Sequence, residues 1–352
     1  MLVNLSFVST EPTGISTYAT NLIPHLQKLQ PILLSSQRID NYDCYSIPAN
    51  LTPEWGSRGH LRRLLWTQLQ LPKISQQLKS HLLFSPVPEA PLFTGCRYIV
   101  TVHDLIPLRF AKLSPLTAYS RYYIPHVLKC AQHILCNSTA TAKDITHFFG
   151  INPSKVTPIL LAHDAGNFRF LNLPKSNYFL YIGRQDPYKN LQRLIAAFAA
   201  MPNYHNYQLW LAGTPDPRYT PGLQTLVNKL GITNYVKFLG YVSYRQLPII
   251  INSAIALVFP SLWEGFGLPA LEGMACGTPV ITSNVSSLPE VAGDAAILVD
   301  PYSTQEISLA METIAHSVEM RSQLSELGLI RAKEFSWHKT GRATVEILSR
   351  YL

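Results

Sequence analysis

Short apolar runs alternate with amphipathic stretches along the whole chain. The runs are rich in Val, Ile, Leu and aromatic residues, as are strands buried on both faces of a parallel sheet. The stretches between them repeat apolar residues at helical spacing. We predict strands at Leu2–Val8, Ile32–Leu34, Leu82–Phe84, Tyr98–Val102, Ile134–Cys136, Tyr178–Ile182, Gln208–Ala212, Val236–Leu239, Ile255–Phe259, Val280–Thr282 and Ile297–Val299. This alternation predicts an α/β fold of doubly wound parallel sheets with helices on both faces.

The length of the chain predicts two domains. A chain of 352 residues is too long for one ordinary core and suits two domains of about 170 residues each. With 47% hydrophobic and 14% charged residues, the composition indicates a globular protein. The segment Phe168–Asn177 carries Pro and Asn just before a predicted strand, so we expect an N-terminal domain over 1–168 and a C-terminal domain over 169–335.

Cysteine usage and hydropathy indicate in which cellular compartment the protein is expected. The five cysteines are odd in number and scattered, and no pair has metal-ligand spacing, so we expect neither a disulfide framework nor a metal site. The N-terminus enters a predicted strand without the features of a signal peptide. The longest apolar stretch, 247–260, is interrupted by Asn252 and is too short to span a bilayer. We therefore expect a cytoplasmic protein that is soluble or peripheral on the inner face of a membrane.

Two glutamates flank a glycine-rich turn in the second half. Glu264 and Glu272 stand on either side of Gly265-Phe266-Gly267, after an apolar run that reads as a buried strand. Pro269 suits the first turn of a helix and Gly277 suits the position after its end. Glu264 is then in the strand-to-helix turn and Glu272 about one turn into the helix. The unpaired N–H groups of a helix N-terminus lie between them, where a phosphate can bind.

A pair of cations follows an earlier predicted strand. Gly183, Arg184 and Lys189 lie in the loop after Tyr178–Ile182, and Asn190 precedes an amphipathic helix. In open α/β sheets, ligands bind beyond the carboxyl ends of the strands. Arg supplies a planar fork and Lys a mobile point charge, which together suit a diphosphate. The alternative is that both are ordinary solvated loop charges.

At these positions the chain resembles the retaining glycosyltransferases of family 4, which have the GT-B fold. The resemblance rests on the E-x7-E spacing, the turn EGFGLP, the strand GTPVITS and the Arg-x4-Lys pair. It implies two Rossmann-like domains facing a central cleft, with the last segment, 336–352, returning as a helix to the N-terminal domain. The C-terminal domain would then hold the nucleotide-sugar donor, and the N-terminal domain the acceptor.

The resemblance also implies roles for individual residues. Glu264 would contact the donor sugar and Glu272 the ribose. Arg184 and Lys189 would bind the diphosphate. The backbone N–H groups of Gly265, Phe266, Gly267 and Leu268 would meet the same diphosphate, with Gly183 beside it. Without the glycine turn and flanking strands, two glutamates at this spacing would be read as a surface feature.

The N-terminal half offers two further candidates. Gly14 precedes a helical pattern and permits close approach of backbone to a phosphate, although family members usually have a more glycine-rich loop. The alternative for Gly14 is a simple turn. His103 ends a predicted strand, followed by Asp104, and the resemblance implies a place near the donor sugar. The alternative is a structural His–Asp turn.

Charge is unevenly distributed. Residues 1–165 carry 14 Lys and Arg against 8 Asp and Glu, whereas 166–352 carry 15 against 13. A basic N-terminal half suggests an anionic partner such as a membrane surface. The segment Leu61–Leu69 adds apolar residues, flanking arginines and a tryptophan, as interfacial helices have. The alternative is a helix that packs Leu61, Leu64, Leu65 and Leu69 on its own sheet. Nucleic acid is not expected, because no recognition motif accompanies the charge.

These features together predict a retaining hexosyltransferase. It would move mannose or a glucose-type sugar from a GDP- or UDP-linked donor to an acceptor hydroxyl of a glycan or a lipid-linked glycan. We expect no cofactor, and no metal because the chain lacks an Asp-x-Asp pair. One alternative is a non-catalytic nucleotide-sugar-binding partner subunit on the same fold. A Rossmann dehydrogenase is disfavoured because no G-x-G-x-x-G opens the first helix.

Overall fold

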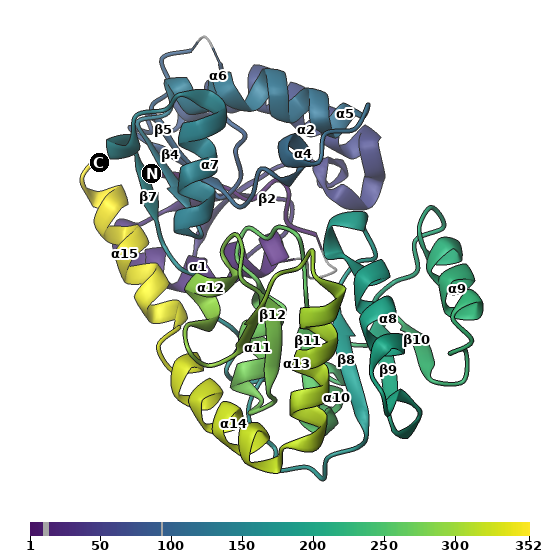
Figure 1. Cartoon of the computed structure of the whole chain (residues 1–352). Coiled ribbons are helices and arrows are strands. Elements are labelled where there is room, and N and C mark those ends of the chain that lie inside the picture. The colour runs from purple at the N-terminus through teal and green to yellow at the C-terminus, as the bar shows by residue number, and fades with distance from the viewer. Residues whose placement is uncertain (10–13, 93) are drawn as a thin grey trace. The chain divides into compact units, whose positions relative to one another are not determined.

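The computed structural model describes residues 1–9, 14–92 and 94–352. The chain divides into two compact units (Figure 1). Unit 1 comprises Met1–Leu161 together with Ser336–Leu352, and unit 2 comprises Ala162–Phe335. Each unit contains one sheet, and every strand pair described in either sheet is parallel. The α/β class predicted from the hydrophobic pattern is thus confirmed.

Unit 1 is built on a seven-stranded sheet of order β3-β2-β1-β4-β5-β6-β7. The strands are β1 (Leu2–Asn4), β2 (Ile32–Ser35), β3 (Asp43–Ser46), β4 (Leu83–Ser85), β5 (Tyr98–Val102), β6 (His133–Cys136) and β7 (Val156–Pro158). The helices are α1 (Gly14–Leu26), α2 (Gly56–Leu69), α3 (Leu71–Gln77), α4 (Ile106–Arg109), α5 (Pro115–Ala118), α6 (Ile124–Cys130), α7 (Thr139–Phe149) and α15 (Trp337–Ser349). All five residues of β5 are buried, as its uniformly apolar sequence predicts.

Both faces of this sheet are covered. Alternate strand residues pack with α2, α3, α6 and α7 in one apolar cluster that includes Val100 and Val102. Thr101 points to the opposite face, where its hydroxyl lies 3.2 Å from that of Tyr18 in α1. The helix α15 packs beside α1 on this second face. The period-2 alternation of strand side chains therefore assigns each helix to a face.

The last helix, α15, is part of unit 1 although it follows unit 2 in the sequence. Ser336 caps its start by accepting a hydrogen bond from Lys339 N. Thr340 Oγ1 donates to Leu160 O at 2.7 Å. At Gly341 an added Cβ would lie 2.3 Å from the Cβ of His25, so a residue without a side chain is needed where α15 crosses α1.

Unit 2 contains a six-stranded sheet of order β10-β9-β8-β11-β12-β13. The strands are β8 (Tyr178–Ile182), β9 (Gln208–Ala212), β10 (Val236–Gly240), β11 (Ala256–Phe259), β12 (Val280–Ser283) and β13 (Ile297–Val299). The helices are α8 (Leu191–Ala200), α9 (Thr220–Lys229), α10 (Leu247–Ser253), α11 (Leu268–Ala275), α12 (Leu288–Ala292), α13 (Thr304–His316) and α14 (Val318–Ala332). α8 packs with α9 and α13, and α11 packs with α12 and α14 (Figure 1). Right-handed crossovers place these two groups on opposite faces of the sheet.

Most predicted strands agree with the structure within one residue, but three points differ. β1 ends at Asn4 rather than Val8, because the Asn4 side chain accepts a hydrogen bond from Ser6 N and turns the chain. The strands β3 and β7 were not predicted. Both are at sheet edges, where polar residues and a proline are tolerated and the apolar pattern is weak.

The boundary between the units comes earlier than the expected 168 and 169. Unit 2 begins at Ala162. Tyr244 explains the difference, since its hydroxyl donates to Asp164 Oδ2 at 3.0 Å and its carbonyl accepts from Asn167 Nδ2 at 2.9 Å. The ring of Phe168 packs edge-on against the same tyrosine with centroids 5.4 Å apart. Contacts between residues this far apart in the sequence cannot be predicted from the local pattern of apolar and polar residues.

The helix α2 turns its leucines outward, contrary to the alternative in which they pack on the sheet. Leu61, Leu65 and Leu69 are 59%, 53% and 61% exposed, and Leu64 alone of the four is half-buried. Arg63 is instead on the buried side, where its Nε and Nη2 donate to Glu89 at 2.7 and 2.8 Å. The leucine face of α2 is therefore a surface feature of unit 1.

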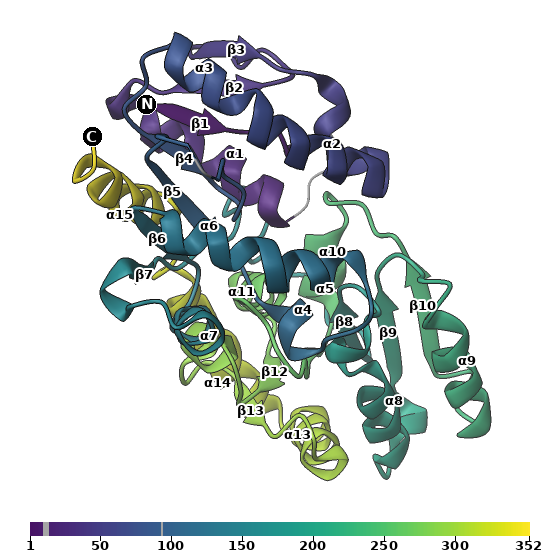
Figure 2. The ribbon, with the colours of Figure 1, turned by 90° about the horizontal axis from the view of Figure 1, so that it is seen from above.

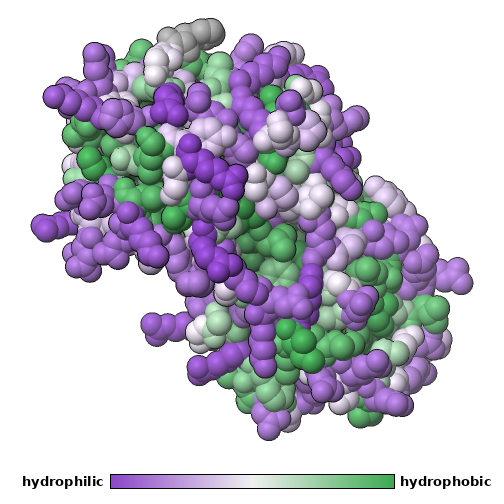
Figure 3. Space-filling model, turned by 90° about the vertical axis from the view of Figure 1, so that its left-hand side faces the viewer, coloured by the Kyte–Doolittle hydropathy of each residue, from purple (hydrophilic) through white to green (hydrophobic). Residues whose placement is uncertain are grey.

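On the side of the molecule that faces left in Figure 1, where α15 lies, hydrophilic side chains spread over most of the surface between smaller hydrophobic patches (Figure 3). Within the described parts of the chain, no helix is both long enough and apolar enough to cross a membrane.

Candidate functional site

The turn between β11 and α11 holds the predicted glutamates in the predicted places. Glu264 is in the turn and Glu272 is in the second turn of α11. Gly267 is the N-cap residue with φ 107°, and a Cβ there would lie 2.6 Å from Leu288 Cδ2. Only glycine fits this position without strain. Glycine has no side chain to cap the helix, Pro269 has no N–H, and Ala270 N and Leu271 N donate to Gly267 O. At the start of α11 the N–H of Leu268 is therefore the group that can meet a ligand.

Two serines from the loop after β12 fix the shape of this turn. Glu264 N donates to Ser286 Oγ at 3.1 Å. The hydroxyl of Ser287 lies 3.0 Å from Glu264 O and 2.8 Å from Phe266 O, and donates to this pair of carbonyls. Ser287 is fully buried. The turn is thus held in one conformation before any ligand arrives, which is the condition for a precise binding site.

Lys189 and Glu264 meet although they are far apart in the sequence. Lys189 Nζ donates to Glu264 Oε1 at 2.6 Å, and the two side chains are only 12% and 10% exposed. The strands that precede them, β8 and β11, are parallel neighbours, so the loops after these strands lie together at the carboxyl end of the sheet. Leu262 N donates to Tyr188 O at 2.7 Å and ties the two loops together. The structure therefore joins the two sequence motifs in one site.

Arg184 occupies the same loop but a different environment. Its Nε lies 2.8 Å from Asp186 Oδ2, and its side chain is 73% exposed. Its carbonyl accepts a hydrogen bond from Tyr181 at 2.6 Å. Gly183, just before it, has φ 146°, and a Cβ there would lie 2.8 Å from the Tyr181 hydroxyl. The backbone of this loop is fixed, whereas the guanidinium stands at the surface.

Glu272 has an environment that the sequence did not reveal. Burial, and secondarily the charge of Asp164, raise the pKa of Glu272 from 4.5 to about 8. Asp164 accepts a hydrogen bond from Tyr244, whose own titration is affected by Glu272. Neither Asp164 nor Tyr244 was predicted as a site residue. Both are neighbours of a predicted site residue, and no local pattern connects them.

This environment makes folding stability depend on pH. A folded-state pKa of about 8 against 4.5 means that the folded protein keeps a proton that the unfolded chain releases. Stability from this group is therefore present at low pH and is lost as the pH rises through about 8. We expect Glu272→Gln, which stays neutral, to gain in Tm over the wild type progressively from pH 5 to pH 9. Parallel Tm curves for the two proteins would contradict the assignment.

The candidates in unit 1 are Gly14 and His103. Gly14 is the first residue of α1 and is exposed. His103 follows β5, and its Nε2 lies 2.8 Å from Pro86 O. A carbonyl only accepts, so Nε2 carries the proton and Nδ1 is left as an acceptor. Burial lowers the pKa of His103 to about 4, so the imidazole is neutral at pH 7. A neutral ring with one open acceptor can receive a hydroxyl hydrogen bond.

Comparisons with solved structures identify the class to which this fold belongs. Sucrose-phosphate synthase from Thermosynechococcus elongatus superposes with a TM-score of 0.79 at 19% identity, covering 99% of this chain and 98% of that one. HepE from Anabaena, in complex with UDP and glucose, superposes with a TM-score of 0.77 at 17% identity, covering 99% of both chains. The predicted GT-B fold is confirmed by these likenesses.

Family models match nearly the whole chain. One described as "Glycosyltransferase Family 4" matches residues 12–164, and one described as "Glycosyl transferases group 1" matches residues 166–329. The chain belongs to glycosyltransferase family 4, as the motif resemblance predicted.

The similar proteins of assigned activity include mannosyltransferases. The O-antigen chain mannosyltransferase B of Escherichia coli is 34% identical over 61% of this chain and 54% of its own length. The O-antigen chain mannosyltransferase RfbU of Salmonella typhimurium is 28% identical over 89% of this chain and 90% of its own length. This chain thus spans about half of the first relative and most of the second.

Proposed function

We propose that this protein is a retaining hexosyltransferase that uses a nucleotide diphosphate sugar. The observation that carries the proposal is the Lys189–Glu264 pair, 2.6 Å apart, beside the uncapped start of α11. A cation and a helix N–H group suit a diphosphate, and a carboxylate next to them suits the hydroxyls of the sugar attached to it. One site then binds both the sugar and the diphosphate, the two groups joined by the bond that breaks.

The proposed roles follow from this placement. Glu264 orients the donor sugar, and Glu272 accepts hydrogen bonds from the ribose. Lys189, Arg184 and the backbone from Gly265 to Leu268 balance the charge that grows on the leaving diphosphate. The same diphosphate takes the proton of the attacking hydroxyl, so no protein base and no metal ion is required. The neutral His103 would accept a hydrogen bond from a sugar hydroxyl.

Relatives favour a particular sugar. Two O-antigen mannosyltransferases are among the similar proteins, so we propose mannose, with a glucose-type sugar as the alternative. GDP and UDP are the proposed nucleotides, and the structural likeness to a UDP-binding protein supports the latter. The proposed acceptor is a hydroxyl of a growing polysaccharide or a lipid-linked glycan.

A panel of nucleotide sugars tests the proposal. GDP-mannose, UDP-glucose and their free diphosphates are screened by thermal shift, since a ligand that binds the folded state raises Tm. The best binder is then offered to glycan acceptors in EDTA, and the anomeric configuration of the product is read by NMR. Retention of configuration is expected. A protein that binds a donor but neither transfers nor hydrolyses its sugar would be a partner subunit. A protein that binds none would overturn the proposal.

The outward face of α2 supports a peripheral membrane location. Leu61, Leu65 and Leu69 recur every four residues and are more than half exposed, and Trp55, which directly precedes α2, is 56% exposed. The guanidinium of Arg62 lies 5.8 Å from the Trp55 ring centroid. Apolar side chains with a tryptophan and arginines are typical of helices that lie in a bilayer interface. We propose that this face binds an anionic bilayer.

Vesicle binding tests this location. Because Arg63 is buried against Glu89, the variants change only exposed residues. Leu61→Ser with Leu65→Ser, and Arg58→Gln with Arg62→Gln, are each expected to weaken co-sedimentation with acidic vesicles. Each cation near the surface contributes about 1 kcal/mol, so the arginine pair should cost roughly tenfold or more. Leu309→Ser with Ile330→Ser, equally exposed in unit 2, is the control. Equal binding of all four proteins would contradict the proposal.

A further inference from the structure

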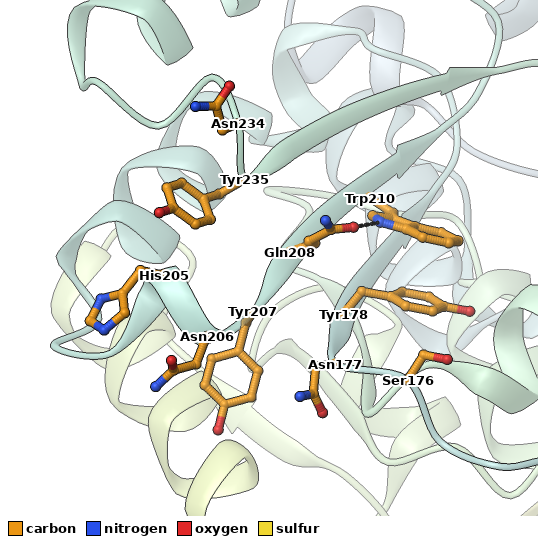
Figure 4. A pocket seen from close by; sticks show the side chains of 10 residues that line it. All are labelled: Ser176, Asn177, Tyr178, His205, Asn206, Tyr207, Gln208, Trp210, Asn234 and Tyr235. Carbon is orange, nitrogen blue, oxygen red and sulfur yellow. Dashed lines mark hydrogen bonds between the residues drawn. The ribbon is translucent and has the colours of Figure 1, made fainter.

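Unit 2 has a pocket on the other side of the sheet from Lys189 and Glu264, along the strand direction. Those two residues follow the carboxyl ends of β8 and β11. The pocket is at the amino ends of β8, β9 and β10, and has a volume of about 340 Å³ (Figure 4). This is within the usual range of small-molecule sites, roughly 300–1,000 Å³. We call it the amide pocket, and it is lined by Ser176, Asn177, Tyr178, His205, Asn206, Tyr207, Gln208, Trp210, Asn234 and Tyr235.

The lining of the amide pocket has a distinct chemistry. Four of its side chains are aromatic and four are primary amides, and the lining residues include no Lys, Arg, Asp or Glu. The lining residues themselves offer no counter-charge to an ionic ligand, and the one cation recorded against a lining ring is Lys237, whose Nζ lies 5.3 Å from the Trp210 ring centroid. A wholly apolar ligand would bury amides without partners, at a cost in free energy. A neutral molecule with many hydroxyls and some apolar CH faces satisfies both kinds of side chain, because amides donate and accept and aromatic rings cover CH groups.

The aromatic side of the pocket is formed in advance. Tyr178 stacks on Trp210 with ring centroids 3.8 Å apart and 6° between planes. Trp210 Nε1 donates to Gln208 Oε1 at 2.8 Å, as Figure 4 shows, and Tyr178 donates to Ile250 O at 2.6 Å. The Tyr207 hydroxyl is 3.4 Å from Ala315 O. Rings held in this way lose little conformational entropy when a ligand binds.

The amide side of the pocket is open to a ligand. Asn177, Asn206 and Asn234 come from the turns that lead into three neighbouring strands. Within the residues that the structure describes, no hydrogen bond is recorded for these three side-chain amides, and all three are exposed. Each therefore has donors and an acceptor available for hydroxyl groups.

We propose that the amide pocket binds one or two sugar residues of a neutral glycan, separately from the transfer site. The ligand class follows from the lining alone. That the glycan is the acceptor chain rests on the proposed function. In that case the pocket would hold a distant part of the chain that is being extended, and a second point of attachment raises the effective concentration of the acceptor at the enzyme.

Direct glycan binding tests this proposal without any nucleotide. The full-length protein is titrated with an α-linked mannose hexamer and with a glucose hexamer of the same length, followed by calorimetry and by ligand-observed NMR. The variants are Trp210→Ala, which removes a ring, and Asn177→Ala with Asn234→Ala, which removes two exposed amides and spares the fold. Gln323→Ala, an exposed amide on α14, is the matched control.

We expect the wild type and Gln323→Ala to bind at least one hexamer, and both pocket variants to bind it at least fivefold more weakly. Nucleoside diphosphate affinity should be equal in all four proteins, which shows that the transfer site is intact. Absence of hexamer binding at millimolar concentration, or equal binding by every variant, would overturn the proposal. If the wild type bound a hexamer but no nucleoside diphosphate, this would count against the proposed function, and the glycan site would still be supported.

Discussion

Lys189→Ala should lower kcat by about 10²–10³-fold while changing the affinity for the nucleoside diphosphate much less. Removing one preorganised donor from a developing negative charge has an effect of this order. Lys189 Nζ is only 2.6 Å from Glu264 and largely shielded from water, so its charge acts in a low-dielectric site. The charge on the leaving diphosphate grows as the sugar departs, so the cation contributes more in the transition state than in the ground state.

Steady-state kinetics with the best donor of the nucleotide panel measure this effect. Lys229→Ala, which removes an exposed lysine at the end of α9, is the control and should behave as the wild type. Arg184→Ala should lower kcat by a smaller factor, because its side chain is 73% exposed and already faces Asp186. A Lys189→Ala enzyme within twofold of the wild type would remove Lys189 from the proposed site.

Glu89→Gln should destabilise the protein by about 3–5 kcal/mol. Removing one partner of a buried ion pair leaves an uncompensated charge, and this is the cost usually measured. Arg63 and Glu89 are 6% and 3% exposed. The carboxylate accepts two hydrogen bonds from the guanidinium, which also donates to Leu51 O at 3.0 Å. A glutamine amide keeps one acceptor oxygen and puts a donor NH2 in place of the other, so the guanidinium would lose one of these bonds and its counter-charge.

Denaturant unfolding followed by tryptophan fluorescence measures the loss, since Trp66 lies in the same helix. The double variant Arg63→Met with Glu89→Leu should recover much of it, because replacing both partners by apolar residues of similar size leaves no buried charge. If Glu89→Gln and the double variant were equally stable, the unpaired charge of Arg63 would not be the cause of the lost stability. The pair also matters for α2, since a buried Arg63 keeps the leucine face outward.

The predicted strands and turns agree with the structure where several neighbouring residues each restrict the backbone in the same way. The segment from β11 through α11 combines a fully apolar strand, a glycine that must adopt φ 107°, Pro269 in the first helical turn and Gly277 after the helix. Each residue acts on its own stretch of backbone, and all favour the same structure. The position of Glu264 in the turn and of Glu272 in the helix was therefore predicted correctly.

The sequence by itself determined the α/β class, most strand positions, the strand–turn–helix context of the glutamates and the family. These depend on periodicity, on glycine and proline, and on spacing within a few residues. Only the tertiary structure decided which side chains meet. It paired Lys189 with Glu264, brought Asp164 near Glu272 and turned the leucines of α2 outward. The physical reason is that burial and charge depend on neighbours that come from distant parts of the chain. A leucine at helical spacing predicts a helix face, but the packing of Arg63, Trp66 and Thr67 in the folded unit decided which face is inside.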